Sequence, residues 1–150
     1  MKRFRFPLRP VAILRAHREL RAKEAFASAM QTLIAAEQRL EAARERVARC
    51  GAALAAARTQ TFTPAEASAT FRAYRAESLA EANAARAATE ARTAMEQRRQ
   101  DYLSANRDLE VVKRLETKAR AAHRAEGLRE EQIVLDDFAG FRAARRSPSP

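Results

Sequence analysis

Side chains that could carry acid–base or metal chemistry are few and scattered along this sequence. His17 and His123 have no acidic or cysteine residue at ligand spacing, and neither belongs to an H-E-x-x-H motif. Cys50 is the only cysteine, which excludes an intramolecular disulfide. Asp136 and Asp137 are adjacent carboxylates, of the kind that lie solvated near a helix end. Three isolated glycines cannot build a phosphate-binding loop, so we predict no enzyme activity, no cofactor and no metal.

The composition is typical of long helices and not of a compact globular domain. Alanine makes up about a quarter of the 150 residues and charged residues 32%, whereas the chain has only three glycines, five prolines and no tryptophan. A two-helix coiled coil buries only a narrow seam, so it folds without a thick aromatic core. The composition therefore favours a coiled coil.

The formal net charge is +10, and the basic residues concentrate near the two ends of the sequence. Residues 1–25 contain eight Lys or Arg against two Glu, and Arg142, Arg145 and Arg146 form a second basic cluster. Such patches attract acidic proteins, anionic lipids or nucleic acid, and charge alone does not decide among them. Because no run of about 18 apolar residues is present, we expect a cytoplasmic protein without a membrane-spanning helix.

A heptad repeat predicts a first helix over about residues 8–58. Large apolar side chains recur every seven residues, and a small one follows each of them by three positions. The large set is Phe26, Leu33, Leu40, Val47 and Leu54, and the small set is Ala29, Ala36, Ala43, Cys50 and Ala57. Upstream, the apolar stripe moves to Ile13, Leu20 and Ala27, which predicts that the seam loosens or changes partner near the N-terminus.

A turn at residues 59–63 is predicted to separate this helix from a second one over about residues 64–140. Thr63 is expected to cap the second helix, with Pro64 in its first turn and Glu66 completing a capping box. A short extra helix near the turn and a break near residues 77–83 remain open alternatives. The second heptad repeat contains Met95, Tyr102 and Leu109 at one position, and Ala105, Val112 and Ala119 at the other.

These elements predict an all-α fold, a long antiparallel two-helix coiled-coil hairpin. The hairpin would form a single domain of residues 1–146, followed by a disordered tail at residues 147–150. An antiparallel hairpin is expected to bring both termini, with most of the basic charge, to one end. The turn and the aromatic residues that follow it would lie toward the other end.

Two surface features are candidates for binding partners. The first joins Lys2-Arg3-Phe4-Arg5-Phe6 to the Phe and Arg residues near the C-terminus, as an insertion tip for an acidic partner. Alternatively, these residues are frayed helix ends without a binding role, and their charge serves only to keep the protein soluble. The second feature is Phe71, Tyr74 and Leu79 near the turn, for which a local helix packed back on the hairpin is an equally simple explanation.

The two ends of the sequence resemble those of the FliJ family, a component of the bacterial flagellar export apparatus. The opening Lys2-Arg3-Phe4-Arg5-Phe6-Pro7-Leu8, followed by Val11, Leu14 and Arg15, resembles the start of that family. The stretch from Asp108 to Phe141, with Arg124-Ala125-Glu126, Glu130-Glu131-Gln132 and Asp136-Asp137, resembles its final helix. The likeness covers nearly the whole chain, although this chain is richer in alanine. The YscO-type stalks of injectisomes are similar in length and shape and remain an alternative.

The resemblance implies a stalk similar to the central γ subunit of rotary ATPases. Such proteins place their paired terminal helices in the central hole of a hexameric export ATPase, contact the cytoplasmic domain of the export gate and bind export chaperones. Carried over to this sequence, the ATPase-ring-binding residues are Arg5, Leu8, Arg15, Arg18, Phe138, Phe141 and Arg142. The export-gate-binding residues are Phe71, Tyr74 and Leu79. The protein would be peripheral at the inner face of the cell membrane through these partners, without a small-molecule substrate.

Two other classes of function stay open from the residues alone. A basic coiled coil could bind nucleic acid, but the Arg residues in the middle of both helices are interleaved with Glu, and no base-reading motif is visible. A structural spacer would need only length and stiffness. We therefore expect an adaptor that does not bind nucleic acid.

Overall fold

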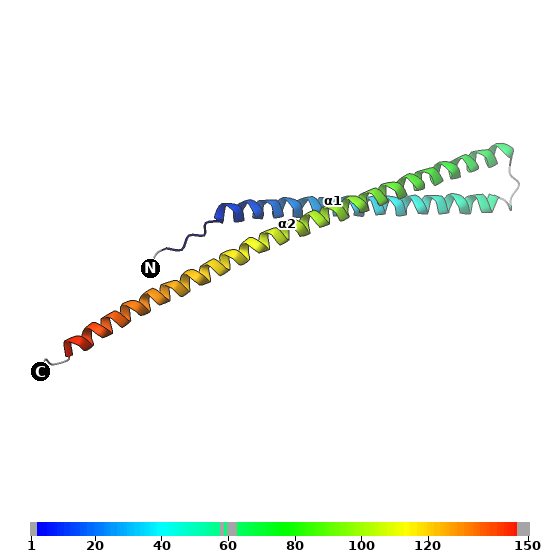
Figure 1. Cartoon of the computed structure of the whole chain (residues 1–150). Helices are drawn as coiled ribbons and strands as arrows, with labels where there is room; N and C mark the ends of the chain where they lie inside the picture. Colours follow the sequence, from blue (N-terminus) through cyan, green and yellow to red (C-terminus); the bar gives the residue numbers. More distant parts are fainter. Residues whose placement is uncertain (1–2, 58, 60–62, 147–150) are drawn as a thin grey trace. The chain divides into compact units, whose positions relative to one another are not determined.

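The computed structural model describes residues 3–57, 59 and 63–146, which form two helices, α1 (Arg9–Ala57) and α2 (Pro64–Arg146) (Figure 1). With 49 and 83 residues, these helices account for almost all of the described chain. The predicted all-α fold of two long packed helices is confirmed. The predicted tail at residues 147–150 and most of the predicted turn at residues 59–63 lie outside the described residues.

The second helix is uninterrupted from Pro64 to Arg146. It has no break near residues 77–83, and the extra helix left open near the turn is not found in the described part of the chain. The helix also runs six residues beyond its predicted end at about residue 140. An isolated glycine inside a helix costs only about 1 kcal/mol relative to alanine, so Gly127 and Gly140 do not end it.

The start of α2 has the predicted capping box. The backbone N–H of Glu66 donates to Oγ1 of Thr63 at 3.4 Å, and the Glu66 carboxylate accepts from Oγ1 and from the backbone N–H of Thr63 at 2.7 and 3.1 Å. These hydrogen bonds, that of the Thr63 hydroxyl first, lower the pKa of the Glu66 carboxyl below its ordinary value of 4.5. Pro64 occupies the first turn, where its missing N–H has no helical partner to lose.

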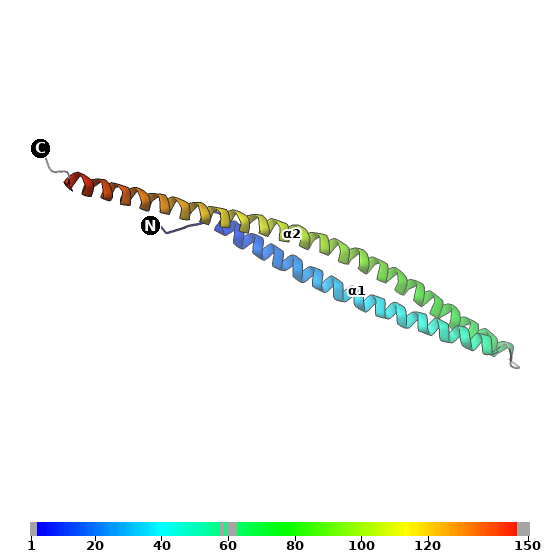
Figure 2. The ribbon, with the colours of Figure 1, turned by 90° about the horizontal axis from the view of Figure 1, so that it is seen from below.

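The chain divides into two compact units, and both helices contribute to each. Unit 1 comprises residues 1–19 and 105–150, and unit 2 comprises residues 20–104. Within unit 2, α1 and α2 lie side by side and run in opposite directions away from the turn, as Figure 1 and Figure 2 show from two sides. Unit 2 is therefore an antiparallel helical hairpin.

The predicted heptad positions form the seam of unit 2. Leu33, Ala36 and Ala43 are buried on α1, and Ala43 is only 1% exposed, while the other predicted seam residues of α1 are half-buried. On α2, Ala88 is buried and Tyr102 stacks on Phe26, with ring centroids 6.1 Å apart and planes 6° from parallel. The small alanine side chains allow the two helices to approach closely, as the sequence predicts.

Ion pairs on both sides of this seam fix the register of the two helices. As the residue numbers rise along α1, those of the partners fall along α2, which is the mark of antiparallel pairing. The pairs are Glu37 with Arg92 at 2.6 Å, Arg44 with Glu81 at 3.8 Å, and Arg46 with Glu77 at 2.8 Å. All six side chains are partly solvated, so each pair contributes little stability and mainly selects one register.

The predicted shift of the apolar stripe near the N-terminus is wrong. Ile13 is 53% exposed, and Leu20 and Ala27 are exposed as well. The less exposed positions of α1 instead continue the main repeat, because no residue is inserted into it and the helix keeps one rotational phase. These positions are Ala12, Arg15, Glu19 and Ala22. The start of α1 therefore meets α2 through small and charged side chains, while its larger apolar side chains face solvent.

Candidate functional site

In unit 1, the residues before α1 form an extended segment that lies against α2. The Phe4 ring meets the imidazole of His123 edge-on, with centroids 5.4 Å apart, and the Arg120 guanidinium lies 5.5 Å from the centre of the same ring. The backbone N–H of Arg9 donates to the carbonyl of Phe6 at 3.2 Å, which begins the first turn of α1. Phe4 thus anchors the N-terminal segment on the longer helix.

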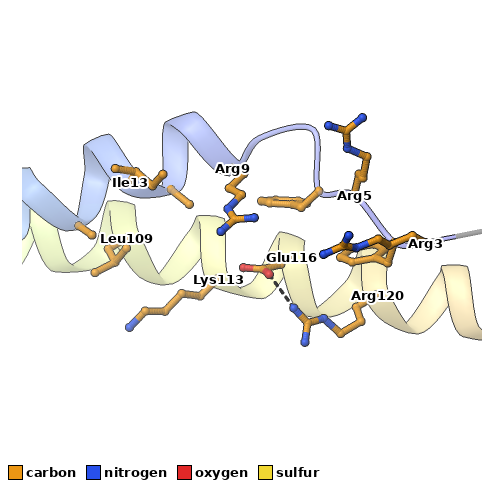
Figure 3. A pocket seen from close by; sticks show the side chains of 12 residues that line it. Arg3, Arg5, Arg9, Ile13, Leu109, Lys113, Glu116 and Arg120 are labelled. Carbon is orange, nitrogen blue, oxygen red and sulfur yellow. Dashed lines mark hydrogen bonds and ion pairs between the residues drawn. The ribbon is translucent and has the colours of Figure 1, made fainter.

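A basic cleft opens between the N-terminal segment, the start of α1 and the facing part of α2 (Figure 3). Five cationic side chains and one carboxylate line it, so its formal charge is +4. The charged lining residues are Arg3, Arg5, Arg9, Lys113, Glu116 and Arg120. Glu116 accepts a hydrogen bond from Arg120 at 2.9 Å, and Arg9 extends from α1 toward α2 near Glu116 in Figure 3. Because Leu109 and Ile13 also line the cleft, it offers both charge and apolar surface to a partner.

The helix α2 continues well past the N-terminal segment, as Figure 2 shows. After the contact of His123 with Phe4 it runs 23 more residues, to Arg146. At about 1.5 Å per residue this terminal segment (residues 124–146) is about 35 Å long. Both described ends of the chain belong to unit 1. Because α2 is 34 residues longer than α1 and runs on past the N-terminal segment, Arg3 and the end of α2 do not lie side by side.

The end of the terminal segment presents two paired aromatic and cationic side chains. Phe138 and Phe141 are each 60% exposed. The Arg142 guanidinium lies 5.9 Å from the centre of the Phe138 ring, and that of Arg145 lies 5.0 Å from the centre of the Phe141 ring. Exposed phenylalanines with arginines over their faces are typical of a protein-binding surface. We call these four residues the Phe–Arg face.

The structure divides the predicted ATPase-ring-binding residues into two groups within unit 1. Arg5 lines the basic cleft, Leu8 is exposed just before α1, Arg15 forms an ion pair with Asp108, and Arg18 is exposed. The other three residues lie on the Phe–Arg face, Phe138 being 15 residues beyond His123. The helix between His123, which contacts the N-terminal segment, and Phe138 is about 22 Å long, so the two groups lie at least that far apart along α2.

The predicted export-gate-binding residues do not share one exposed face. Phe71 and Leu79 are exposed on α2 of unit 2. Tyr74 is half-buried and turned toward α1, where a side-chain carbon built on Gly51 would lie 3.8 Å from its ring. The heptad position of Tyr74, seven residues before Glu81 on the seam, accounts for this difference. Phe71 and Leu79 stay exposed, whereas Tyr74 packs in the hairpin.

Two charged residues of the basic cleft were not predicted. Lys113 and Arg120 supply the charge of the α2 side, whereas Phe4, which anchors the N-terminal segment, was part of the predicted insertion tip. Their spacing of seven residues places Lys113 and Arg120 on one side of a heptad helix, a signal that is visible in the sequence. What the sequence does not indicate is that the N-terminal segment folds back onto that side.

The residues with side chains suited to acid–base or metal chemistry lie apart from one another. Within the described part of the chain, no three His, Cys, Asp or Glu side chains lie together as they would to hold a metal ion. Cys50 is half-buried on the seam, and Asp136 and Asp137 are solvated on the terminal segment. No helix in the described ranges is long and apolar enough to cross a membrane.

The model of the flagellar FliJ protein family matches residues 4–148 of the sequence, nearly its whole length. The chain belongs to the FliJ family. No curated protein and no solved structure matches it. FliJ proteins are non-enzymatic components of flagellar export, so this FliJ-family chain is a protein of flagellar export and protein transport. The resemblance found at the two ends of the sequence is thereby confirmed.

Proposed function

We propose that this FliJ-family chain is the stalk of the flagellar type III export apparatus. The terminal segment of α2 inserts into the central hole of the hexameric export ATPase, and the hairpin of unit 2 contacts the cytoplasmic domain of the export gate. Export chaperones bind the same adaptor, and its association with the membrane is indirect, through these partners. The Phe–Arg face at the end of a long helix, in a chain of this family, is the observation that supports the proposal most strongly.

Insertion into a ring would bury the Phe–Arg face. Phe138 and Phe141 leave most of their area in water in the free chain, and this apolar area stabilises a complex when a partner covers it. Arg142 and Arg145 hold their charge over the rings, so they remain available to carboxylates of the ring wall. Two aromatic anchors with adjacent arginines are the residue types that dominate the binding energy of protein interfaces.

The basic cleft would provide a second contact, at the entrance of the ring. Its formal charge of +4 attracts an acidic rim, and Arg18 adds exposed charge on the same unit. Charges of this kind act mainly on the association rate and on specificity, and their effect falls with salt. Residues at the far end of the terminal segment would act mainly on the dissociation rate, because they become fully buried.

Two matched pairs of substitutions separate the two proposed partners. The ring variant carries Phe138→Ala and Phe141→Ala, and the gate variant carries Phe71→Ala and Leu79→Ala. All four side chains are exposed on the same helix, so each pair removes two large apolar groups without opening a core. Binding of each variant to the purified ATPase hexamer and to the purified gate domain is measured by calorimetry or surface plasmon resonance.

We expect the ring variant to bind the ATPase at least about tenfold more weakly, because truncating two interface anchors costs more than about 1.4 kcal/mol. Its affinity for the gate domain should be unchanged, and the gate variant should show the opposite pattern. Stimulation of ATP hydrolysis by the chain should fall only for the ring variant. If both variants bound the ATPase as tightly as the wild type, the terminal segment would not be the inserted part.

A further inference from the structure

The terminal segment of α2, which the proposed function inserts into the ring, contains an acidic stretch to which that function assigns no contact of its own. Residues 126–137 contain five carboxylates and one arginine, a formal charge of −4 in a chain whose net charge is +10. The carboxylates are Glu126, Glu130, Glu131, Asp136 and Asp137, all exposed. Arg129 pairs with Glu126 at 3.7 Å. The acidic stretch therefore runs counter to the charge of the rest of the protein.

The acidic stretch also has a shallow hollow with an apolar lining. Gly127 has no side chain, so a depression forms between Glu130 and Glu131, lined by Val134 and Leu135. Both of these apolar residues are more than half exposed. A cationic or aromatic side chain would fit this hollow, because carboxylates flank it and aliphatic groups form its floor. The N-terminal segment, with alternating Arg and Phe at residues 3–6, has that chemistry.

The formal charges of the basic cleft and the acidic stretch are equal in size and opposite in sign, +4 against −4, and both surfaces carry apolar side chains. They cannot meet within one chain. Lys113 and Arg120 of the cleft and Glu130 of the acidic stretch lie on the same continuous helix, which would have to fold back on itself. An occupant with the right charge and the right shape must therefore come from another molecule.

We propose that a second copy of this chain is that occupant. Two copies pair in antiparallel fashion through α2, and each lays its acidic stretch in the basic cleft of the other. The α2 side of the cleft is centred near residue 117 and the acidic stretch near residue 131, about 20 Å apart along the helix. A twofold axis near Arg124, midway between the two, therefore brings the acidic stretch of each copy to the basic cleft of the other, so that both contacts form together as an isologous dimer requires.

The dimer covers surfaces that the single chain leaves in water. Leu128, Val134 and Leu135 on the terminal segment would pack toward Phe6 and Ile13 at the cleft of the partner copy. The charges contribute the specificity and the salt dependence, and the apolar groups contribute most of the affinity. This self-association goes beyond the proposed role in export and needs no other protein. Because it covers the terminal segment and the basic cleft, it competes with insertion into the ATPase ring.

Charge reversal at each side, followed by mixing, tests the proposal. The first variant carries Glu130→Lys and Glu131→Lys, and the second carries Arg5→Glu and Lys113→Glu. A control variant carries Glu90→Lys and Glu96→Lys, which are exposed carboxylates of unit 2. Each full-length chain is studied by sedimentation equilibrium up to about 100 µM, at salt concentrations of about 50 mM and 500 mM. Circular dichroism verifies that every variant keeps the helix content of the wild type.

We expect the wild type and the control to dimerise at low salt, with a dissociation constant that rises about tenfold or more at high salt. Each reversed variant alone should be monomeric at concentrations where the wild type is a dimer. An equimolar mixture of the two should form a heterodimer. One of its contacts keeps the native charges of +4 and −4, and in the other the two introduced lysines of one copy face the two introduced glutamates of its partner. A merely general loss of solubility or stability would not produce this recovery.

Three results would overturn the inference. The wild type could remain monomeric at the highest concentration and lowest salt. Both reversed variants could dimerise as tightly as the wild type, which would place the contact elsewhere. The mixture could stay monomeric although each variant alone has lost its dimer. None of these outcomes bears on binding to the ATPase hexamer, which the ring variant tests separately.

Discussion

Substitution of Ala43 by leucine tests the closest approach of the two helices. Ala43 is 1% exposed, the lowest exposure of the buried apolar side chains on the seam. A leucine there adds three carbon atoms where α2 already fills the space, so the helices must separate or the new side chain must take a strained rotamer. Overpacking of this kind costs about 1–3 kcal/mol.

The expected change in melting temperature follows from the chain length. Unfolding entropy is about 2.1 cal/mol/K per residue, or about 0.3 kcal/mol/K for the whole chain. A loss of about 1–3 kcal/mol therefore lowers the melting temperature by about 3–10 °C. Thermal unfolding followed by circular dichroism at 222 nm measures this shift directly.

Ala48→Leu is the matched control, because Ala48 is exposed on the same helix. Alanine and leucine have similar helix propensities, so this substitution should change the stability by less than about 0.5 kcal/mol. The reasoning is refuted if the two leucine variants melt at the same temperature. Ala43 would then have free space beside it, and the alanine positions would not set the distance between the helices.

Three further predictions concern an ion pair, the helix cap and the anchor of the N-terminal segment. Exchanging the partners, as Arg46→Glu with Glu77→Arg, should restore most of the stability that either single substitution removes, with a coupling of about 0.2–1 kcal/mol in a double-mutant cycle of urea unfolding. Thr63→Ala should reduce the pH dependence of the free energy of unfolding. Because the pKa of Glu66 is lowered in the folded state, its ionised carboxylate stabilises the fold above pH 4.5. This contribution is lost as the pH falls through the lower folded-state pKa. Urea unfolding from pH 6 down to pH 3 should show that loss in the wild type and less of it in the variant, and equal pH profiles would contradict the cap. Phe4→Ala should free the N-terminal segment, so that trypsin cleaves it several-fold faster while the melting temperature changes little; an unchanged cleavage rate would mean that Phe4 does not hold the segment.

The seam was predictable because it depends on local spacing. Phe26, Leu33 and Ala43 occupy heptad positions that any pair of packed helices must bury, and the capping box at Thr63 is a contact between residues three apart. Such features depend on the helical repeat and not on long-range structure. For the same reason the family resemblance at both ends of the chain could be found before the fold was known.

The start of the chain was harder to predict. Ile13 and Leu20 have the spacing of a seam, but the helix keeps the phase set by the longer repeat downstream, and these side chains stay in solvent. Arg15 occupies the seam position instead and pairs with the exposed Asp108, and a charged residue on a seam gives no apolar signal. The face that a helix buries is set by the apolar repeat along its whole length, so a short stripe of three residues does not determine it.

The distance by which α2 runs past the N-terminal segment could not be predicted from the repeats either. Antiparallel pairing predicts that the ends approach each other only if the two helices have similar lengths. Here α1 ends at the turn after 49 residues and α2 continues for 83, so the surplus of α2 runs beyond Phe4. The sequence contains this difference, since more residues follow Pro64 than lie between Arg9 and the turn. The heptad repeat, however, predicts only that the helices pair, and it does not show which residues of the longer helix lack a partner on the shorter one.

The central claim is that the terminal segment of α2 extends beyond the N-terminal segment, and the distance between Val11 and Phe138 tests it most directly. Spin labels at the two positions, in a Cys50→Ala background, are measured by double electron–electron resonance in dilute solution. The contacts of Phe4 with His123 and of Arg15 with Asp108 place Val11 opposite a residue near Lys113. The 25 residues from there to Phe138 predict a distance of about 35–40 Å, whereas labels at Val11 and Arg114 should lie within about 20 Å. A Val11–Phe138 distance below about 25 Å would show that the chain ends meet, and would contradict the account.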